Sequence, residues 1–396
     1  MINKEMTALG KSPSAIRELF EFGKQRAALV GRENVFDFSL GNPSVPPPQQ
    51  VQKAMLDILR ESDPIAVHGY TSAPGDVAAR SAIADSLNRR FGTHFTHRNI
   101  CMTCGAASSL TACLKALSVD ENSEFIAIAP YFPEYGQFAA IAGGSLRVVP
   151  ADIRDFQIDF DNLEALINKN TQAVIVNSPN NPSGVVYTEA TIKRLAQLLD
   201  VKSRELGHTI YILSDEPYRE LVYDGVQVPF ITNYYANTIV CYSFSKSLSL
   251  PGERIGYMLV PDEIDEFEDI CAATMGSLRR MGYVCAPSFM QMVLARCMDV
   301  QPDLETYRRN RELLYNSLME IGYRCVKPSG AFYLFVESPG GDAKAFSEAA
   351  KRHDVLVVAG NDFGCSTHFR LCYCVSYDTI RRSLPAFKAL YQESKR

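Results

Sequence analysis

The sequence of 396 residues has no excess of basic side chains and no basic block. Lysine and arginine together number 40, against 45 aspartate and glutamate residues, which leaves a net charge of -5. This balance gives no electrostatic reason to expect nucleic-acid binding. No apolar run approaches the roughly 18 residues that a membrane-spanning helix needs. The opening residues Met1 to Met6 lead into polar sequence, unlike a signal peptide. We therefore expect a soluble, cytoplasmic protein that binds neither nucleic acid nor a membrane.

The sequence also lacks the spacings that mark metal sites and disulfide frameworks. Cys101 and Cys104 form a lone CxxC without a second pair, and Cys372 and Cys374 alternate as strand residues do. The histidines form no HxxxH pattern. In a cytosolic chain of this size, such cysteines are usually small buried apolar residues. We therefore expect no metal site.

Residues from about 100 to 241 alternate between strand and helix patterns. Short apolar runs, each suited to one buried strand, recur at 125–128, 173–176, 210–213 and 238–241. Helical segments such as 190–206 lie between some of them. This alternation predicts a mainly parallel sheet that is covered by helices.

The two ends of the chain predict a second, smaller unit. An amphipathic helix is expected over 14–30, and Pro46-Pro47-Pro48 then interrupt regular structure before a helix at 49–59. The last hundred residues mix helices and strands, expected at 304–321, 331–336 (a strand pair), 343–352, 355–358 and 369–375. We therefore predict an α/β fold with a large domain at 46–290 and a smaller α+β domain formed by residues 1–45 and 291–396.

Polar segments follow three of the apolar runs. They are Asn177 to Gly184, Ser214 to Tyr218 and Tyr242 to Lys246. Ligands of open parallel sheets bind beyond the carboxyl ends of the strands. These three segments are therefore the expected location of a binding site.

Lys246 and Asp215 are the candidate reactive groups of these segments. A lysine is usually a solvated surface charge, but Lys246 follows a buried strand among serines, and Arg254 lies eight residues further on. Burial and a nearby cation favour the neutral amine that Schiff-base chemistry needs. Asp215 is either a helix N-cap or turn residue or the carboxylate partner of a protonated ring nitrogen. Taken singly, neither residue decides between its two interpretations.

Further motifs accompany these two residues in a fixed order. They are Asn181-Pro182-Ser183-Gly184, Asp215 with Tyr218, Ser243-x-Ser245-Lys246, and Arg254. In order and approximate spacing they resemble the fold-type I, class I and II aminotransferases. Weaker motifs extend the resemblance along nearly the whole chain: Gly41-Asn42-Pro43, Tyr70 with Gly75 and Arg80, Thr103 to Ala107, Pro130 to Tyr135, and Phe369-Arg370-Leu371. The resemblance implies the PLP-transferase fold of type I, with pyridoxal 5'-phosphate held as a Schiff base on Lys246.

The resemblance also implies a role for each residue at the cofactor. Lys246, Asp215 and Tyr218 would be catalytic, with Asp215 at the ring nitrogen and Tyr218 donating to the phenolic oxygen of the ring. Free N–H groups at the start of a helix, together with hydroxyl and charged side chains, would hold the phosphate: Gly105, Ala106, Ala107, Ser243, Ser245 and Arg254. Phe132 would stack on the pyridine ring; without its motif, core packing is equally expected.

At the substrate, the resemblance implies three contacts. Asn181 would bond both the ring oxygen and a carboxylate, Arg370 would clamp the α-carboxylate, and Gly41 lies in the substrate-contacting loop. Outside the motif order, Arg370 would be a plain edge-strand charge. Two positions depart from the family pattern. Ala107 leaves its phosphate contact to the backbone alone, and Ser183 replaces the commoner threonine.

The implied activity is transfer of an amino group between an L-amino acid and a 2-oxo acid by a ping-pong mechanism. Arg280, with Arg279 as the alternative, resembles an arginine that reads a distal carboxylate across a dimer, which favours aspartate or glutamate with 2-oxoglutarate. A pair of surface cations is an equal alternative. Tyr70 resembles the tyrosine that reaches the phosphate in the neighbouring subunit. A homodimer with shared active sites is therefore expected.

Other reactions on the same scaffold stay open at this point. An aromatic aminotransferase and a C–S β-lyase are the main alternatives, because one cofactor-bound substrate can lose different groups. Amine-forming decarboxylases and cyclopropane-forming synthases share the scaffold too, but a carboxylate clamped by Arg370 argues against decarboxylation. A cofactor-binding regulator would need a DNA-binding module, for which the motifs leave no room.

Overall fold

A seven-stranded sheet forms the centre of the computed structural model, which describes residues 1–11 and 15–395. Its strand order is β2-β8-β7-β6-β5-β3-β4. The strands are β2 (Ile100–Thr103), β3 (Glu124–Ile128), β4 (Ser145–Val149), β5 (Thr171–Asn177), β6 (Tyr211–Asp215), β7 (Thr238–Ser243) and β8 (Gly256–Leu259). Strands β3 to β7 pair in parallel, whereas β8 runs antiparallel to β7 and β2. The predicted α/β class with a mainly parallel sheet is confirmed.

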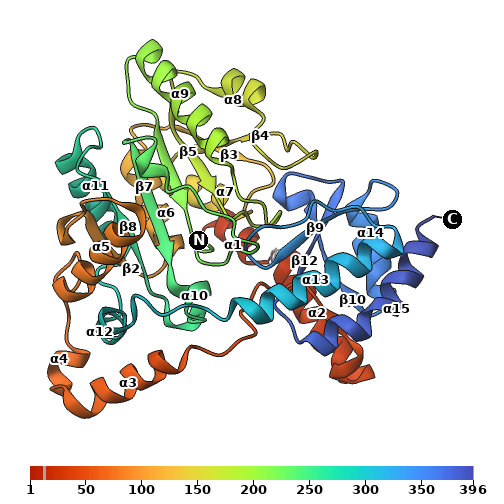
Figure 1. The fold of residues 1–396 in the computed structure, drawn as a ribbon. Helices are drawn as coiled ribbons and strands as arrows, with labels where there is room; N and C mark the ends of the chain where they lie inside the picture. Colours follow the sequence, from red (N-terminus) through yellow and green to blue (C-terminus); the bar gives the residue numbers. More distant parts are fainter. Residues whose placement is uncertain (12–14, 396) are drawn as a thin grey trace.

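Helices cover both faces of this sheet (Figure 1). One face packs on α6 (Ala106–Leu117), α7 (Tyr135–Ala142) and α11 (Phe267–Arg280). The other packs on α8 (Phe160–Leu166), α9 (Glu189–Leu206), α5 (Val77–Phe91) and α12 (Ser288–Cys297). Strand β3 shows the reason, because Phe125 and Ala127 point to the first layer while Ile126 and Ile128 point to the second. Strands buried on both faces have continuous apolar runs, as the sequence does here.

Local sequence fixes where the helices begin and end. Helix α9 starts after Thr188, whose side chain accepts a hydrogen bond from the Thr191 N–H, and it stops at Gly207 with φ of 75°. Helix α5 begins in the same way after Asp76. Such caps satisfy the backbone groups that a helix end leaves without partners.

The C-terminal third builds a second, smaller assembly, on the right of Figure 1. A three-stranded antiparallel sheet has the order β11-β12-β9, with β9 (Tyr333–Glu337), β11 (Val358–Ala359) and β12 (His368–Cys372). A short parallel pair joins β1 (Phe36–Asp37) to β10 (Val355–Leu356). The surrounding helices are α13 (Leu304–Ile321), α14 (Ala343–Arg352), α15 (Tyr377–Glu393) and, from the N-terminal segment, α2 (Ala15–Val30).

Several expected elements differ from the observed ones. Helix α13 has its expected bounds. Residues 331–336 hold one strand instead of the expected pair: Ala331 takes a left-handed φ of 55°, and β9 begins only at Tyr333. The partner of β9 is β12, which is distant in sequence. Ser14, the expected start of the first helix, lies outside the described residues. The two-domain division stays a prediction.

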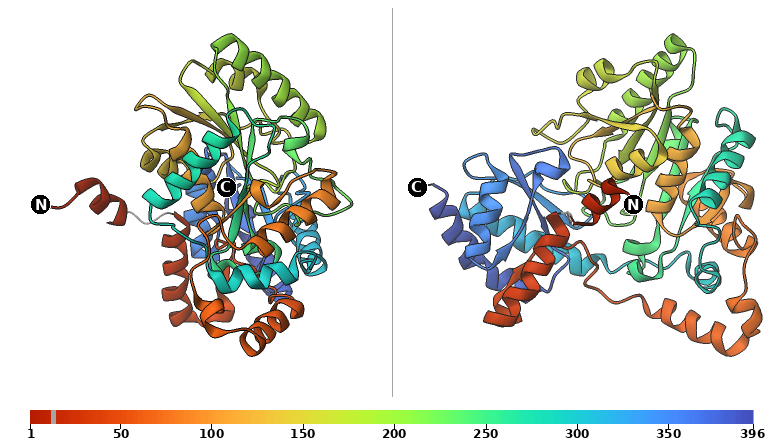
Figure 2. Two further views of the ribbon diagram at one scale, coloured as in Figure 1. Left: turned by 90° about the vertical axis from the view of Figure 1, so that its left-hand side faces the viewer. Right: turned by 180° about the vertical axis from the view of Figure 1, so that it is seen from behind.

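Three further helices belong to the N-terminal segment and to the chain after β7. Helix α3 spans Gln49–Glu61, α4 spans Pro64–His68 and α10 spans Phe244–Ser247. A short helix, α1 (Lys4–Lys11), precedes them and stands out from the body of the molecule (Figure 2). All cysteines are free thiols and are buried or half-buried. Among the described residues, no helix is long and apolar enough to cross a membrane, and no three metal-ligating side chains gather.

Candidate active site

The polar segments predicted to form the site meet at the carboxyl edge of the large sheet. Asn177 at the end of β5 lies in register with Asp215 at the end of β6, and Ser243 ends the next strand, β7. A pocket opens at this edge. Most of the predicted cofactor residues line it: Ala106, Ala107, Phe132, Asn181, Asp215, Tyr218, Ser243, Ser245, Lys246 and Arg254.

Lys246 enters this pocket from the short helix α10. Its side chain is half-buried, and Nζ donates a hydrogen bond to the Gly41 carbonyl oxygen at 2.6 Å. Burial lowers the pKa of the ammonium group, and the guanidinium groups of Arg370 and Arg254 act in the same direction. The amine is therefore disposed to lose its proton, as a nucleophilic lysine requires.

Asp215 lies buried at the floor of the pocket. The Tyr135 hydroxyl donates to Oδ2 at 2.5 Å, while Oδ1 is buried without a hydrogen-bond partner among the described residues. Burial raises the pKa of this carboxyl to about 7; the Tyr135 hydrogen bond opposes the rise and the nearby Glu216 adds to it. A buried acceptor without a partner is costly. Oδ1 is therefore suited to a ligand that brings its own donor.

The residues predicted to bind the phosphate lie together at the start of α6. Gly105 precedes this helix with φ of 94°, and a Cβ built there would lie 3.4 Å from Arg254 Nη2 and 3.7 Å from Ser243 Oγ. The Ser243 and Ser245 hydroxyls are 2.7 Å apart. Gly256 permits the close approach, since a Cβ on it would lie 2.8 Å from the Gly105 Cα. N–H groups at the start of a helix, two hydroxyls and a cation thus lie close together, and groups of these kinds bind anions.

Arg370 reaches the same region from the smaller sheet. It lies on β12, the middle strand, so it is not the edge-strand charge that was the alternative interpretation. Nη1 donates to Asn181 Oδ1 at 3.1 Å and Nη2 donates to the Ser39 carbonyl oxygen. In the described part of the chain, the buried Nε has no acceptor. Two hydrogen bonds thus hold this guanidinium, and one of its donors is left without an acceptor in the described part of the chain.

Two predicted residues lie away from the pocket in the single chain. The Tyr70 side chain is 97% exposed, and Arg280, like its alternative Arg279, is exposed at the end of α11. Both positions would need a second subunit to reach a site. Their roles stay predictions, as do the individual roles of the pocket residues.

Sequence reasoning assigned no role to some residues that the fold brings to the site. Tyr135 belongs to a quoted motif, yet its hydrogen bond to Asp215 spans 80 positions. The Asn177 side-chain amide also donates to Asp215, at 2.9 Å to the carbonyl oxygen. Leu110 and Phe138, which complete the pocket wall, carry no sequence signal beyond helical periodicity.

These features define the ligand that would fit the pocket. It would present an anionic group at the start of α6, a donor at Asp215 Oδ1 and an electrophilic carbon near Lys246. Pyridoxal phosphate has a phosphate, a protonatable ring nitrogen and an aldehyde, so the residues present fit it.

Comparison with known proteins agrees with this geometry. Residues 33–387 match the family described as aminotransferase class I and II. The chain is 28% identical to aromatic-amino-acid aminotransferase 2 of Thermococcus litoralis, over 97% of each chain. It is 29% identical to a probable aspartate aminotransferase of Methanocaldococcus jannaschii, over 96% of this chain and 97% of the other.

Solved structures extend the likeness to the whole fold. An amino transferase from Eubacterium rectale has a TM-score of 0.98 and 55% identity, over 100% of both chains. Aspartate aminotransferase from Thermus thermophilus, solved with maleate, has a TM-score of 0.86 and 26% identity, over 98% of this chain and 99% of the other. Both sequence and fold lead to one conclusion: the chain belongs to the class I and II aminotransferases and is an enzyme that uses pyridoxal phosphate.

Proposed function

We propose that the enzyme transfers the amino group of aspartate or glutamate to a 2-oxo acid such as 2-oxoglutarate, by a ping-pong mechanism at the pocket around Lys246. One observation carries the proposal. Asp215 Oδ1 and Arg370 Nε are both buried and without partners among the described residues. Asp215 lines the same pocket as Lys246, and Arg370 is hydrogen-bonded to Asn181, which also lines it. An acceptor for a ring nitrogen and a donor for a carboxylate are what cofactor and amino acid would each require.

In the proposed reaction, Arg370, Lys246 and Asp215 would each have a separate role. Arg370, steadied by Asn181, would bind the α-carboxylate and so orient the Cα–H bond. Lys246 Nζ would take the Cα proton as a general base and return it on the other side of the reaction. Asp215 would hold a proton at the ring nitrogen through Oδ1. Bound pyridoxal phosphate supplies the aldehyde carbon and the electron-withdrawing ring.

The acidic substrate class is supported from two sides. The Thermus thermophilus relative was solved with maleate, a dicarboxylate. In this chain Arg279 and Arg280 form an exposed cationic pair at the end of α11. An arginine can recognise a carboxylate through two parallel hydrogen bonds. We therefore propose that Arg280, with Arg279 as the alternative, reads the distal carboxylate in a neighbouring subunit.

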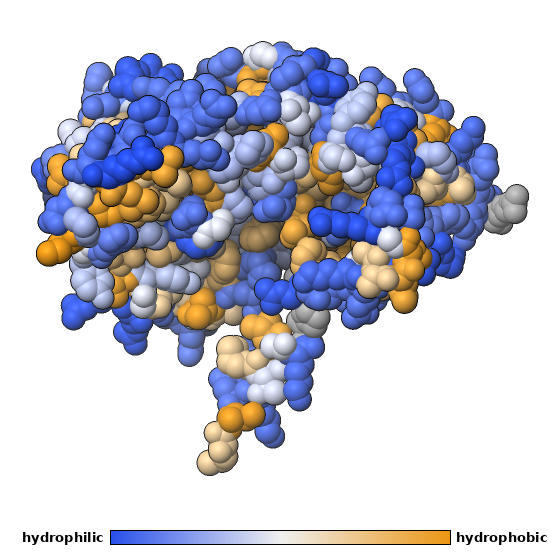
Figure 3. Space-filling model, turned by 90° about the horizontal axis from the view of Figure 1, so that it is seen from below, coloured by the Kyte–Doolittle hydropathy of each residue, from blue (hydrophilic) through white to orange (hydrophobic). Residues whose placement is uncertain are grey.

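A homodimer is part of the proposal. Helix α1 has no buried residue and carries the exposed side chains of Met6 and Leu9. Figure 3 shows the segment with α1 extending from the body of the molecule, with hydrophobic surface along it. The ring of Tyr70 is also almost fully exposed. Exposed apolar groups of this kind are typical of surfaces that a partner covers, and a second copy would also bring Tyr70 and Arg280 to a site. We propose a cytoplasmic location.

Absorption spectra of the purified holoenzyme test the proposal. L-Aspartate or L-glutamate should shift the visible band of the bound cofactor to shorter wavelength, and 2-oxoglutarate should restore it. Arg280→Ala should weaken the response to these donors but spare L-alanine, whereas the same selective loss in Arg279→Ala would assign the role to the alternative arginine. No visible band after addition of pyridoxal phosphate would refute the cofactor site, and a band that no amino acid moves would refute transamination.

The same experiment addresses the aromatic alternative, which the name of the Thermococcus litoralis relative favours. A stronger response to L-phenylalanine or L-tyrosine than to L-aspartate would establish that reading and exclude the acidic one. Release of pyruvate and ammonia from a cysteine-type donor would identify a β-lyase.

A further inference from the structure

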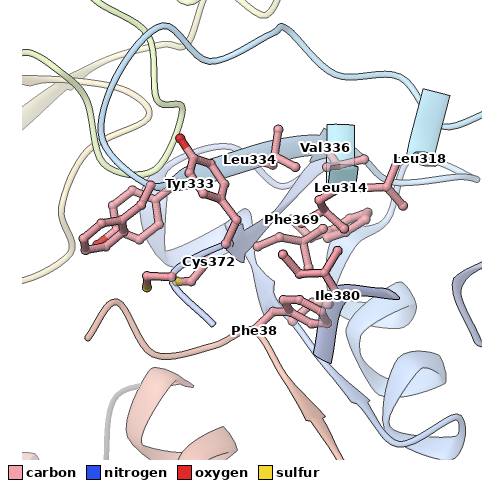
Figure 4. Packing of buried hydrophobic residues seen from close by; sticks show 14 of the residues in the cluster. Phe38, Leu314, Leu318, Tyr333, Leu334, Val336, Phe369, Cys372 and Ile380 are labelled. Carbon is pink, nitrogen blue, oxygen red and sulfur yellow. The ribbon is translucent and has the colours of Figure 1, made fainter. Parts of the chain in front are cut away.

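Tyr333 is a buried tyrosine at the start of β9 whose hydroxyl faces the active site. Its hydroxyl oxygen lies 2.7 Å from that of Tyr218, and the two rings meet edge to face with centroids 5.6 Å apart. Figure 4 shows the Tyr333 hydroxyl directed away from the apolar cluster that contains Phe369 and Ile380. The ring therefore belongs to the core, while the hydroxyl belongs to the site.

Two more groups of the site contact Tyr333. The Arg370 guanidinium lies over its ring, 4.8 Å from the centroid. The hydroxyl also lies against Gly41, where an added Cβ would be only 2.3 Å away. The Gly41 carbonyl oxygen in turn accepts the hydrogen bond from Lys246. The Tyr333 side chain thus contacts the Tyr218 hydroxyl, the Arg370 guanidinium and the loop at Gly41, whose carbonyl oxygen bonds Lys246.

The fold holds this side chain in place from behind. Ala331, two residues earlier, has the left-handed φ of 55°, and its carbonyl oxygen accepts from the hydroxyls of Tyr223 at 2.6 Å and Tyr373 at 3.1 Å. Tyr333 also pairs with Cys372 across the β9–β12 ladder. Backbone in a sparsely populated conformation persists only where its surroundings fix it. The position of the Tyr333 hydroxyl is therefore determined by the core.

We propose that Tyr333 is a positioning residue for amino transfer: its hydroxyl holds the Tyr218 hydroxyl as a donor to the cofactor, and its ring holds the Arg370 guanidinium. The inference rests on the proposed function, in which Tyr218 donates to the phenolic oxygen of pyridoxal phosphate. Because the single O–H of Tyr218 donates to the cofactor, the Tyr333 hydroxyl must be the donor in its hydrogen bond to the Tyr218 oxygen. Each bond in such a chain strengthens the next.

A consequence can be measured on the bound cofactor without turnover. When the Lys246 nitrogen loses its proton beside the bound cofactor, the negative charge on the cofactor's phenolic oxygen is stabilised by the hydrogen bond from Tyr218. Weakening that donor disfavours the deprotonated form, so the pH midpoint of the visible absorption change should rise. Tyr333→Phe removes the hydroxyl and keeps the ring. We expect an upward shift of about half a pH unit, in keeping with one modest hydrogen bond.

A double-mutant cycle separates this role from a structural one. Tyr218→Phe should raise the midpoint further than Tyr333→Phe, and the double variant should match Tyr218→Phe alone. Tyr235→Phe is the matched control, because this buried phenol donates to the Ile210 carbonyl oxygen at the amino end of β6, whereas the site lies at the carboxyl end. It should leave the midpoint unchanged. With the ring retained, Tyr333→Phe should lower kcat and leave KM for the amino acid within about twofold, whereas Tyr333→Leu should raise KM.

Gly41→Ala provides a second route that keeps every hydroxyl. Its Cβ would displace the Tyr333 hydroxyl, so the midpoint should rise as in Tyr333→Phe. The inference would be overturned if neither Tyr333→Phe nor Gly41→Ala moved the midpoint. It would also be overturned if Tyr333→Phe shifted the midpoint equally in the wild type and in the Tyr218→Phe variant. Absence of any visible band in the wild-type enzyme would instead overturn the proposed cofactor site.

Discussion

Replacement of Asp215 by asparagine should stabilise the cofactor-free protein, and increasingly so as the pH rises from 5 to 8. Burial raises the pKa of this carboxyl from 3.8 to about 7 in the folded protein. Between these two values the unfolded chain binds fewer protons than the folded one. Stability is therefore lost as the pH rises from about 3.8 to about 7 and stays constant beyond that range. Asparagine cannot ionise and removes this dependence.

The size of the effect follows from the two pKa values. A difference of about 3 corresponds to about 4 kcal/mol of unfolding free energy. Roughly 2 kcal/mol of this is already lost at pH 5, because the unfolded carboxyl is mostly ionised there. We therefore expect the unfolding free energy of Asp215→Asn, relative to wild type, to increase by roughly 2 to 3 kcal/mol between pH 5 and pH 8.

Urea unfolding of the apoenzyme, followed by circular dichroism, measures this difference. Circular dichroism is the suitable signal because the sequence contains no tryptophan. Asp161→Asn is the control, since that carboxylate is fully exposed and should show no such trend. Adding pyridoxal phosphate to the wild type should shrink the pH dependence, because a protonated ring nitrogen would offset the buried charge. A relative stability that stays flat from pH 5 to pH 8 would refute the assigned burial of a charged Asp215.

Three further substitutions test the site and its support. Arg370→Lys should raise KM for the amino donor by about 10- to 100-fold, since charge-assisted bidentate geometry is lost, while the cofactor absorption band stays unchanged. Tyr135→Phe removes the hydrogen bond that lowers the pKa of Asp215; the acid limb of the kcat profile should therefore move to higher pH, and an unmoved limb would exclude the contact. Glu216→Gln leaves the buried Arg219 guanidinium without its ion pair and should cost about 3 to 5 kcal/mol in a urea unfolding assay, with a loss under about 1 kcal/mol contradicting the pairing.

The sequence predicted those features that depend on local pattern. Continuous apolar runs such as 173–176 predicted strands buried on both faces, and their alternation with helices predicted the α/β class. The polar segments after β5, β6 and β7 carry their chemistry in contiguous residues, so Lys246 and Asp215 could be singled out before any contact was known. Boundaries set by a capping residue or by hydrophobic periodicity, as in α13, were also predicted well, because those signals lie within a few positions of the helix end.

Long-range pairing was beyond the reach of sequence pattern. The antiparallel β8 in a parallel sheet and the pairing of β9 with β12 depend on which surfaces meet after the chain has folded. Taken alone, Arg370 fitted an edge-strand charge. The structure instead places it, buried, on a middle strand between β11 and β9.

The physical state of the reactive groups was decided by the tertiary structure as well. The amino-acid order determines that Asp215 ends one buried strand, that Lys246 follows the next, and that Arg254 comes eight residues later. Only packing determines that Asp215 is buried beside Tyr135, with a pKa near 7 and with one oxygen that no described residue bonds. Packing also brings Tyr333 to Tyr218 across 115 positions. Burial and hydrogen bonding arise from contacts between distant segments, and those contacts set the charge and donor strength on which the chemistry depends.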